Sequence, residues 1–191
     1  NREQAPGSDP ADPLCSPGVS PRVTHRGEDV NWETHPQFEI AMQARFHEAD
    51  LLGHINNAVY LHYMEQAAIE HATSLGLTVD ASRAFGGVFV ARRHEIEFLR
   101  AAFPGDVVRV QTWLLEPHGA RVTRCYQISR VADSAGEPFT GRMPRREAPL
   151  IAQDVLVRAV TEWVFMSEEG RPRRIPEGIL ALFARAGVVP S

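Results

Sequence analysis

One long amphipathic helical pattern follows a first strand-like segment and precedes four more strand-like segments. This order limits the folds that the chain can adopt. From Asn57 to about Ser74, apolar side chains recur three and four residues apart, as in a helix with one buried face. The segments that favour β-strands are 38–46, 86–99, 107–116, 121–131 and 154–166. An antiparallel sheet must cover its apolar face, and this helix is the only segment large enough to do so. The pattern predicts the α+β class, with the last four strands in a meander.

The composition indicates a single domain. A chain of 191 residues with 43% hydrophobic content is long enough for one core and short for two, and we assign residues 37–191 to that domain. Residues 1–36 hold six of the 14 prolines, so we expect a Pro-rich, flexible N-terminal tail anchored by Trp32. Apolar runs fall far short of the roughly 18 residues that span a bilayer, which favours a soluble protein without a membrane partner. The two cysteines are too few for a disulfide scaffold, which favours a cytoplasmic location. A net charge of −4 argues against nucleic acid as a partner.

The segment from Asp50 to Asn57 places an acidic side chain and a glycine directly before the helix. A helix N-terminus has backbone N–H groups without intrahelical acceptors and carries partial positive charge, which favours a carbonyl oxygen or an anion there. An aspartate a few residues upstream can attack the carbon of that carbonyl or activate a water molecule. The same residues can instead form only an Asx-turn and a helix N-cap. The segment therefore predicts either a hydrolytic site or a capped turn.

Residues 46–67 resemble the signature of the hotdog-fold acyl-CoA thioesterases of the 4-hydroxybenzoyl-CoA type. The residues that carry the resemblance are Asp50, Gly53, Asn57, Tyr60 and Glu65. Two later segments, 94–106 and 171–176, resemble a strand junction and the closing segment of the same family, so the similarity spans about residues 38–180. It implies a hotdog fold, in which an antiparallel five-stranded sheet wraps around one long helix. It also implies a homodimer or homotetramer whose paired subunits form the active sites.

The resemblance also implies roles for individual residues. It makes Asp50 the nucleophile or general base, and the backbone N–H of Asn57 the group that polarises the thioester carbonyl. Asn56 is the natural N-cap of the helix, while His54 is a secondary acid–base candidate. Glu65 is the second candidate base, because some members of the family place their carboxylate on this helix.

Substrate contacts are expected at two places. Gly53 and Asn56 shape the turn, and Tyr60 and Phe89 are aromatic candidates for the wall of an acyl pocket. The family holds coenzyme A phosphates with basic residues in the turn between its third and fourth strands, and arginine forks suit phosphates. The basic residues in that part of this chain are His118, Arg121 and Arg124. Another basic candidate is the Arg-containing segment 134–151, which favours either disorder or a functional loop.

The sequence shows no motif for another hydrolytic chemistry. It lacks a G-x-S-x-G elbow, an H-E-x-x-H helix, a P-loop and a G-x-G-x-x-G turn, so we expect neither a metal nor a cofactor, with coenzyme A present only as part of the substrate. The leading hypothesis is an acyl-CoA thioesterase that releases free acid and CoA. The alternatives are an acyl-carrier-protein thioesterase, a non-catalytic hotdog module that binds acyl thioesters, and a hotdog hydratase using Asp50 with His54.

Overall fold

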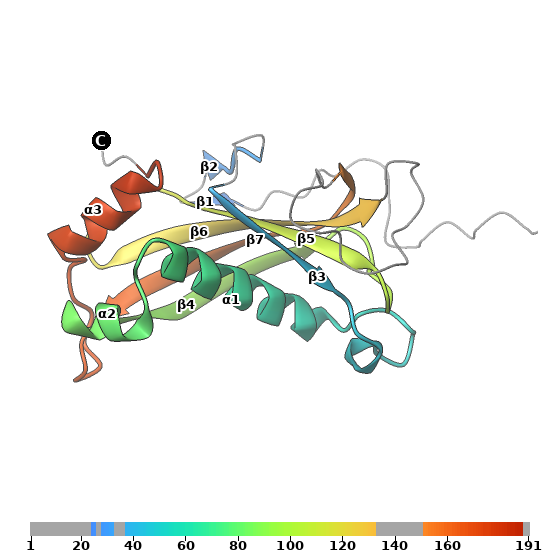
Figure 1. Ribbon diagram of the computed structural model, residues 1–191, viewed down its shortest axis with the longest axis horizontal. Coiled ribbons are helices and arrows are strands. Elements are labelled where there is room, and N and C mark those ends of the chain that lie inside the picture. Colours follow the sequence, from blue (N-terminus) through green and yellow to red (C-terminus); the bar gives the residue numbers. More distant parts are fainter. Residues whose placement is uncertain (1–23, 26–27, 33–36, 133–150, 189–191) are drawn as a thin grey trace, which may run out of the picture.

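The computed structural model describes residues 24–25, 28–32, 37–132 and 151–188 (Figure 1). The strands are β1 (Thr24–His25), β2 (Glu28–Asp29), β3 (Phe38–Gln43), β4 (Val88–Phe98), β5 (Val107–Leu114), β6 (Arg121–Ala132) and β7 (Ile151–Met166). The helices are the 3₁₀ helix η1 (Phe46–Glu48) and the α-helices α1 (Asn57–Ser74), α2 (Val79–Ala84) and α3 (Glu177–Arg185). The predicted long helix and the five predicted strands all form.

The main sheet has the strand order β3-β5-β6-β7-β4, with every neighbouring pair antiparallel. Only β5, β6 and β7 follow one another as a meander, so the expected meander of four strands is wrong. Between β3 and β5 in the sequence, α1 carries the chain across the sheet, and β4 then pairs with β7 at the opposite edge (Figure 1). In the sequence, α1 therefore lies between β3 and β4, the two strands that form opposite edges of the sheet.

The sheet curves around α1, and the contact between them forms the larger core (Figure 1). The buried side of α1 repeats every three or four residues, and it carries Tyr60, Tyr63, Met64, Ala67, Ala68 and His71. Ala67 is fully buried, and its small side chain lets the helix approach the sheet closely. On the facing strands, Val108, Val110, Tyr126 and Ile128 point toward the helix from alternate positions. The predicted α+β arrangement of a five-stranded sheet around one long helix is confirmed.

Two short helices that the periodicity did not predict close one end of the sheet. α2 begins after Thr78, whose side chain caps it by accepting the N–H of Ala81 at 3.2 Å. α3 buries Ile179 and Phe183 in a second apolar cluster. Figure 1 shows both helices at the end of the sheet where α1 terminates. This end is therefore enclosed by α1, α2 and α3 together.

The other face of the sheet carries a smaller cluster that includes Val30, Trp113 and Cys125. Trp32 stands edge to face against Trp113 with 5.7 Å between ring centroids, which confirms the anchoring contact expected for Trp32. The N-terminal part of the predicted tail, residues 1–23, lies outside the described residues. Among the described helices, none is long and apolar enough to cross a bilayer.

Candidate active site

The loop before α1 is closed by hydrogen bonds between its own backbone groups. Asp50 N–H donates to the carbonyl of His54 at 2.8 Å, and Gly53 N–H donates to the carbonyl of Asp50 at 3.0 Å. Gly53 has φ +79°, a left-handed conformation that favours glycine. Outside this turn, Asn56 N–H donates to Glu48 and Ile55 N–H to Ala102. The position of Asp50 is thus set by the turn and by its anchors to the rest of the chain.

The Asp50 side chain is exposed, and only one of its two carboxylate oxygens accepts hydrogen bonds from described residues. Its Oδ1 accepts the backbone N–H of Leu52 at 2.8 Å and that of His54 at 3.3 Å. Oδ2 makes no hydrogen bond to any described residue. The predicted Asx-turn is confirmed, and it is compatible with a chemical role because one carboxylate oxygen remains open to solvent.

The first amides of α1 are satisfied with one exception. Asn56 is the N-cap, as predicted, and its Oδ1 accepts the N–H of Ala58 at 2.9 Å. Its carbonyl accepts the N–H of Val59, also at 2.9 Å. Within the described part of the chain, the N–H of Asn57 has no acceptor. A helix-terminal donor therefore remains available at the position where the resemblance places the carbonyl-polarising group.

The other catalytic candidates on this part of the chain differ in exposure. The His54 ring packs edge to face on Phe103, with centroids 5.1 Å apart. Glu65 is exposed, and it lies eight residues after the first residue of α1, or about 12 Å along the helix at 1.5 Å per residue. Tyr60 is 1% exposed, and its hydroxyl accepts the backbone N–H of Ala102 at 2.9 Å. Within one subunit, this hydrogen bond connects the first turn of α1 to the loop between β4 and β5.

Tyr63 and Glu48 form a hydrogen bond beside this loop that the sequence pattern does not predict. The Tyr63 hydroxyl donates to Glu48 Oε2 at 2.6 Å, and the same oxygen accepts the backbone N–H of Arg45 at 2.7 Å. Burial, followed by the bond to the Glu48 carboxylate, raises the pKa of Tyr63, which stays protonated. Both residues line an open cavity of about 750 Å³ between β3, η1 and α1. The signal in the sequence was the position of Tyr63 three residues after Tyr60, on the same helix face.

The residues expected to bind the carrier lie at the opposite end of the sheet. The turn between β5 and β6, with His118 and the start of β6, lies at the end where α1 terminates (Figure 1). Arg121 is exposed there and pairs with Glu162 at 3.4 Å. Arg124 is only 5% exposed. Residues three apart on a strand point to opposite faces, so the expectation that Arg121 and Arg124 form one phosphate-binding surface is wrong.

Phe89 and Arg124 instead face a common cavity of about 170 Å³ under α1, α2 and α3. The Phe89 ring also packs on Phe165 at a centroid distance of 5.2 Å. The loop candidates of segment 134–150 lie outside the described residues. Among the residues that are described, no three His, Cys, Asp or Glu side chains come together as a metal-binding group.

The sheet wrapped around one helix, with an acidic turn at the N-terminus of that helix, defines a hotdog-fold protein. Residues 44–183 match the family described as the thioesterase-like superfamily, and the chain belongs to it. It is therefore an enzyme of the thioesterase class, a hydrolase of thioester bonds.

Known proteins resemble the chain in sequence and in structure. It is 26% identical over 145 residues, which are 76% of this chain and 67% of the relative, to the chloroplastic acyl-acyl carrier protein thioesterase ATL2 of Arabidopsis thaliana. A thioesterase from Thermus thermophilus, solved with coenzyme A and Zn, has 23% identity and a TM-score of 0.60 over 79% of this chain and 95% of its own. The 1,4-dihydroxy-2-naphthoyl-CoA thioesterase Slr0204 from Synechocystis has 17% identity and the same TM-score, 0.60, over 77% and 95%. At these identities, the structural similarity shows the shared fold.

Proposed function

We propose that the chain hydrolyses acyl-CoA thioesters at the loop before α1, with Asp50 as nucleophile or general base. The observation that carries this proposal is the pair of open groups at one helix end. Asp50 keeps one free carboxylate oxygen, and the Asn57 N–H is a free donor, among the described residues. The hydrogen bonds of residues 48–56 hold the loop in place, so both groups are organised before substrate binds.

The chemistry follows from what each group can do. The thioester carbonyl oxygen accepts the Asn57 N–H, which stabilises the negative charge that develops on that oxygen. In the general-base route, Asp50 takes a proton from water as the water oxygen bonds to the carbonyl carbon, the C–S bond breaks, and the thiolate of the carrier takes up the proton. In the nucleophilic route, Asp50 displaces the thiolate to form a mixed anhydride, which water then hydrolyses. Both routes end with a free acid and a free thiol.

A second subunit completes this proposal. β4 is eleven residues long and pairs within the described chain only with β7, and it exposes Val90 and Phe98. Long edge strands seek pairing partners. A two-fold axis beside β4 pairs it antiparallel with its copy and extends the sheet. This pairing reverses the second subunit, so Arg121 of one subunit and Asp50 of the other lie at the same end of the extended sheet.

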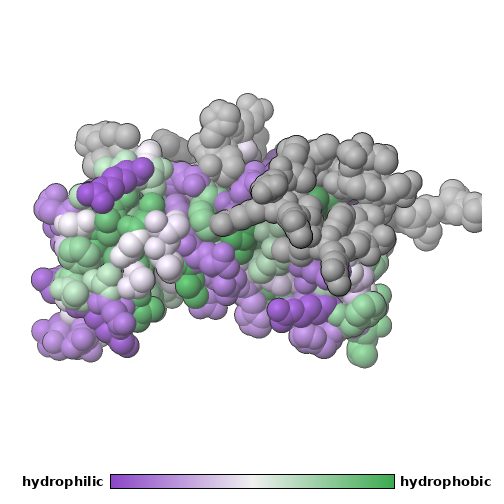
Figure 2. Space-filling model, in the orientation of Figure 1, coloured by the Kyte–Doolittle hydropathy of each residue, from purple (hydrophilic) through white to green (hydrophobic). Residues whose placement is uncertain are grey.

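Apolar exposure at the loop supports an interface or substrate contact there as well. Phe46, Leu51 and Leu52 are 84%, 105% and 78% exposed. Figure 2 shows green, apolar surface at the end of the molecule that carries this loop. Single exposed apolar residues are ordinary, but a group of large ones beside a charged site favours contact with a second surface.

Acyl-carrier protein is the second candidate carrier. It is supported by the name of the Arabidopsis relative, an acyl-acyl carrier protein thioesterase. An acidic carrier protein needs a basic docking surface, and the segment that holds Arg142, Arg145 and Arg146 lies outside the described residues.

Release of free thiol distinguishes the two candidate carriers in one assay. Acyl-CoA and acyl-carrier-protein thioesters with the same acyl groups are offered to the enzyme in the presence of a chelator, since we propose that no metal takes part. Turnover of acyl-CoA that falls in Asp50→Asn supports the proposal. Thiol release from the acyl-carrier-protein thioester but not from acyl-CoA identifies acyl-carrier protein as the carrier. Binding of acyl-CoA without thiol release refutes the proposed hydrolysis of acyl-CoA.

A further inference from the structure

The cavity at the end of the sheet opposite to Asp50 is lined mainly by apolar side chains, together with the hydroxyl residues Thr73, Thr78 and Ser82 and one charged group. It measures about 170 Å³ and is lined by side chains of α1, α2, α3 and four strands, such as Ala72, Val79, Phe89 and Phe183. Figure 2 shows green, apolar surface gathered at this end, around α2 and α3. The charged member of its wall is Arg124.

Arg124 lies on the inner face of β6, in a row of apolar and aromatic neighbours. Val122 precedes it and Tyr126 follows it on the same face, and both are buried. Its Nη1 donates to His71 Nδ1 at 2.8 Å and to Thr112 Oγ1 at 3.2 Å. Nε and Nη2 have no hydrogen bond to a described residue. No Asp or Glu within the described ranges forms an ion pair with it.

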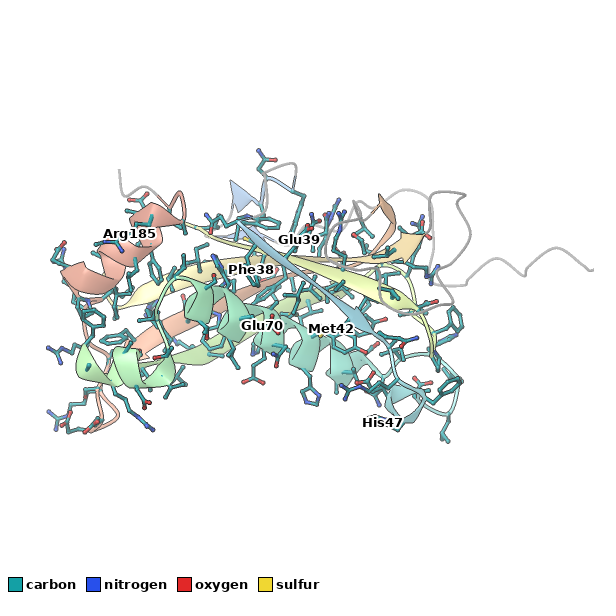
Figure 3. All side chains as sticks on the ribbon, viewed as in Figure 1. Phe38, Glu39, Met42, His47, Glu70 and Arg185 are labelled. Carbon is teal, nitrogen blue, oxygen red and sulfur yellow. The ribbon has the colours of Figure 1, made fainter. Side chains whose placement is uncertain are left out.

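His71 cannot neutralise this charge. The guanidinium has only donors, so His71 Nδ1 must be the acceptor in their hydrogen bond. Burial and the nearby Arg124 lower the pKa of His71 to about 4, and the imidazole is neutral at pH 7. The ring is also held from the other side, because Phe38 stacks on it with 5.2 Å between centroids. Figure 3 shows Phe38 on β3 beside the C-terminal half of α1.

A buried cation without an anion costs several kcal/mol, and the cavity beside it has the size of a small ring compound, since a cavity of about 150 Å³ takes up benzene. We propose that this cavity binds the carboxylate of a small apolar acid, with Arg124 as the recognition residue. A carboxylate accepts two parallel hydrogen bonds from a guanidinium, and the apolar wall takes the remainder of the ligand. The carboxylate can belong to a free acid or, resting on the proposed function and subunit pairing, to the distal end of an acyl thioester that reacts at Asp50 of the second subunit.

Calorimetry with benzoate and benzamide tests the proposal, because the two probes share size and ring but differ in charge. For the wild-type protein at pH 7, we expect benzoate to bind at least tenfold more tightly than benzamide. This comparison needs no variant. Equal affinities, or no binding of benzoate, would overturn the proposal.

Variants then assign the difference to Arg124. In Arg124→Met, which replaces the cation by an apolar side chain, we expect the preference for benzoate to disappear. Arg83→Met is the matched control, because Arg83 is an exposed cation on α2 next to the cavity, and there the preference should remain. Should Arg124→Met fail to fold, Ala72→Leu fills the cavity without touching the charge, and we expect it to weaken both probes. An unchanged benzoate preference in a folded Arg124→Met contradicts the proposal.

A second experiment separates the two sources of the carboxylate. Glutaryl-CoA and pentanoyl-CoA have acyl chains of equal length, but only the first ends in a carboxylate. A kcat/KM at least tenfold higher for glutaryl-CoA, lost in Arg124→Met, shows that the acyl group supplies it, whereas equal kcat/KM with tight benzoate binding shows that a free acid does. The binding experiment does not depend on hydrolysis. Absence of all thiol release therefore defeats the proposed function and leaves the carboxylate site to the calorimetry.

Discussion

Replacement of Asp50 by Asn removes the charge of the candidate catalytic group and keeps the atoms that hold its loop. Asp50 Oδ1 accepts N–H groups from Leu52 at 2.8 Å and His54 at 3.3 Å. An amide oxygen at the same place accepts the same two hydrogen bonds. We therefore expect the thermal midpoint of Asp50→Asn to stay within about 2 °C of wild type, as for an exposed substitution worth at most about 0.5 kcal/mol.

The effect on turnover should be much larger than the effect on stability. A group that acts in the transition state contributes on the order of 100-fold to kcat, which corresponds to about 2.7 kcal/mol at 1.36 kcal/mol for each factor of ten. Thiol release from acyl-CoA at saturating substrate measures this loss directly. Because the carboxylate is aimed at the reacting carbon and not at the carrier, we expect KM to change little.

Two further variants make the result interpretable. Asp50→Ala loses both loop hydrogen bonds, so it should lose activity and also about 1 kcal/mol of stability, or roughly 2–4 °C. Glu65→Gln tests the second candidate base, which lies about 12 Å along α1, and it should keep wild-type kcat. Turnover by Asp50→Asn near the wild-type value refutes the role of this carboxylate, and a collapse in Glu65→Gln assigns the role to the helix.

Three other predictions concern pH, the carrier and the assembly. The pKa of His71 falls from 6.5 in the unfolded chain to about 4 in the fold. Its contribution to the free energy of unfolding, on the order of 3 kcal/mol, is therefore complete above pH 6.5 and is lost as pH falls toward 4. Urea unfolding of His71→Asn should show a smaller loss of stability over that range than wild type, and an equal loss contradicts the assignment. Arg121→Ala should raise KM for acyl-CoA several-fold without changing kcat, while a short acyl-pantetheine should be unaffected; equal effects on both substrates make Arg121 structural. Light scattering should show at least a dimer, and Val90→Lys on the β4 edge should weaken it; an active wild-type monomer at micromolar concentration refutes the paired site.

The local parts of the fold could be predicted because they depend on spacing within one segment. The helix was predicted from Asn57 to about Ser74 and observed at Asn57–Ser74, because apolar spacing, an N-cap at Asn56 and a left-handed Gly76 all mark its ends. The place of β4 in the sheet was not predictable in this way. Strand order depends on which edge the chain reaches after α1, and alternation within β4 carries no information about its neighbour.

The residues of the candidate site that are close in sequence could likewise be predicted together, whereas the distant ones could not. Asp50, Asn56 and the amide of Asn57 are neighbours in sequence, so a turn and a helix cap were enough to place them together. Arg121 is separated from them by the length of the sheet, and in the proposed dimer it is the second subunit that brings such residues to one end. The proposed relation between Arg121 and Asp50 depends on the assembly and could not follow from the pattern of one chain.

The burial of Arg124 follows from the alternation of side chains along β6 and not from its closeness to the preceding turn. Arg121 and Arg124 follow the turn at Gly119 closely in the sequence, but both belong to β6, which begins at Arg121. Strand alternation places Arg124 with Val122 and Tyr126, two buried residues, and away from the exposed Arg121. Applied to a strand, the period of two predicts a cation inside the apolar face. A cation in that position requires an acceptor, and the neutral His71 together with Thr112 supplies hydrogen bonds but no negative charge. The missing charge is the physical reason to look for an acid in the cavity that Arg124 lines.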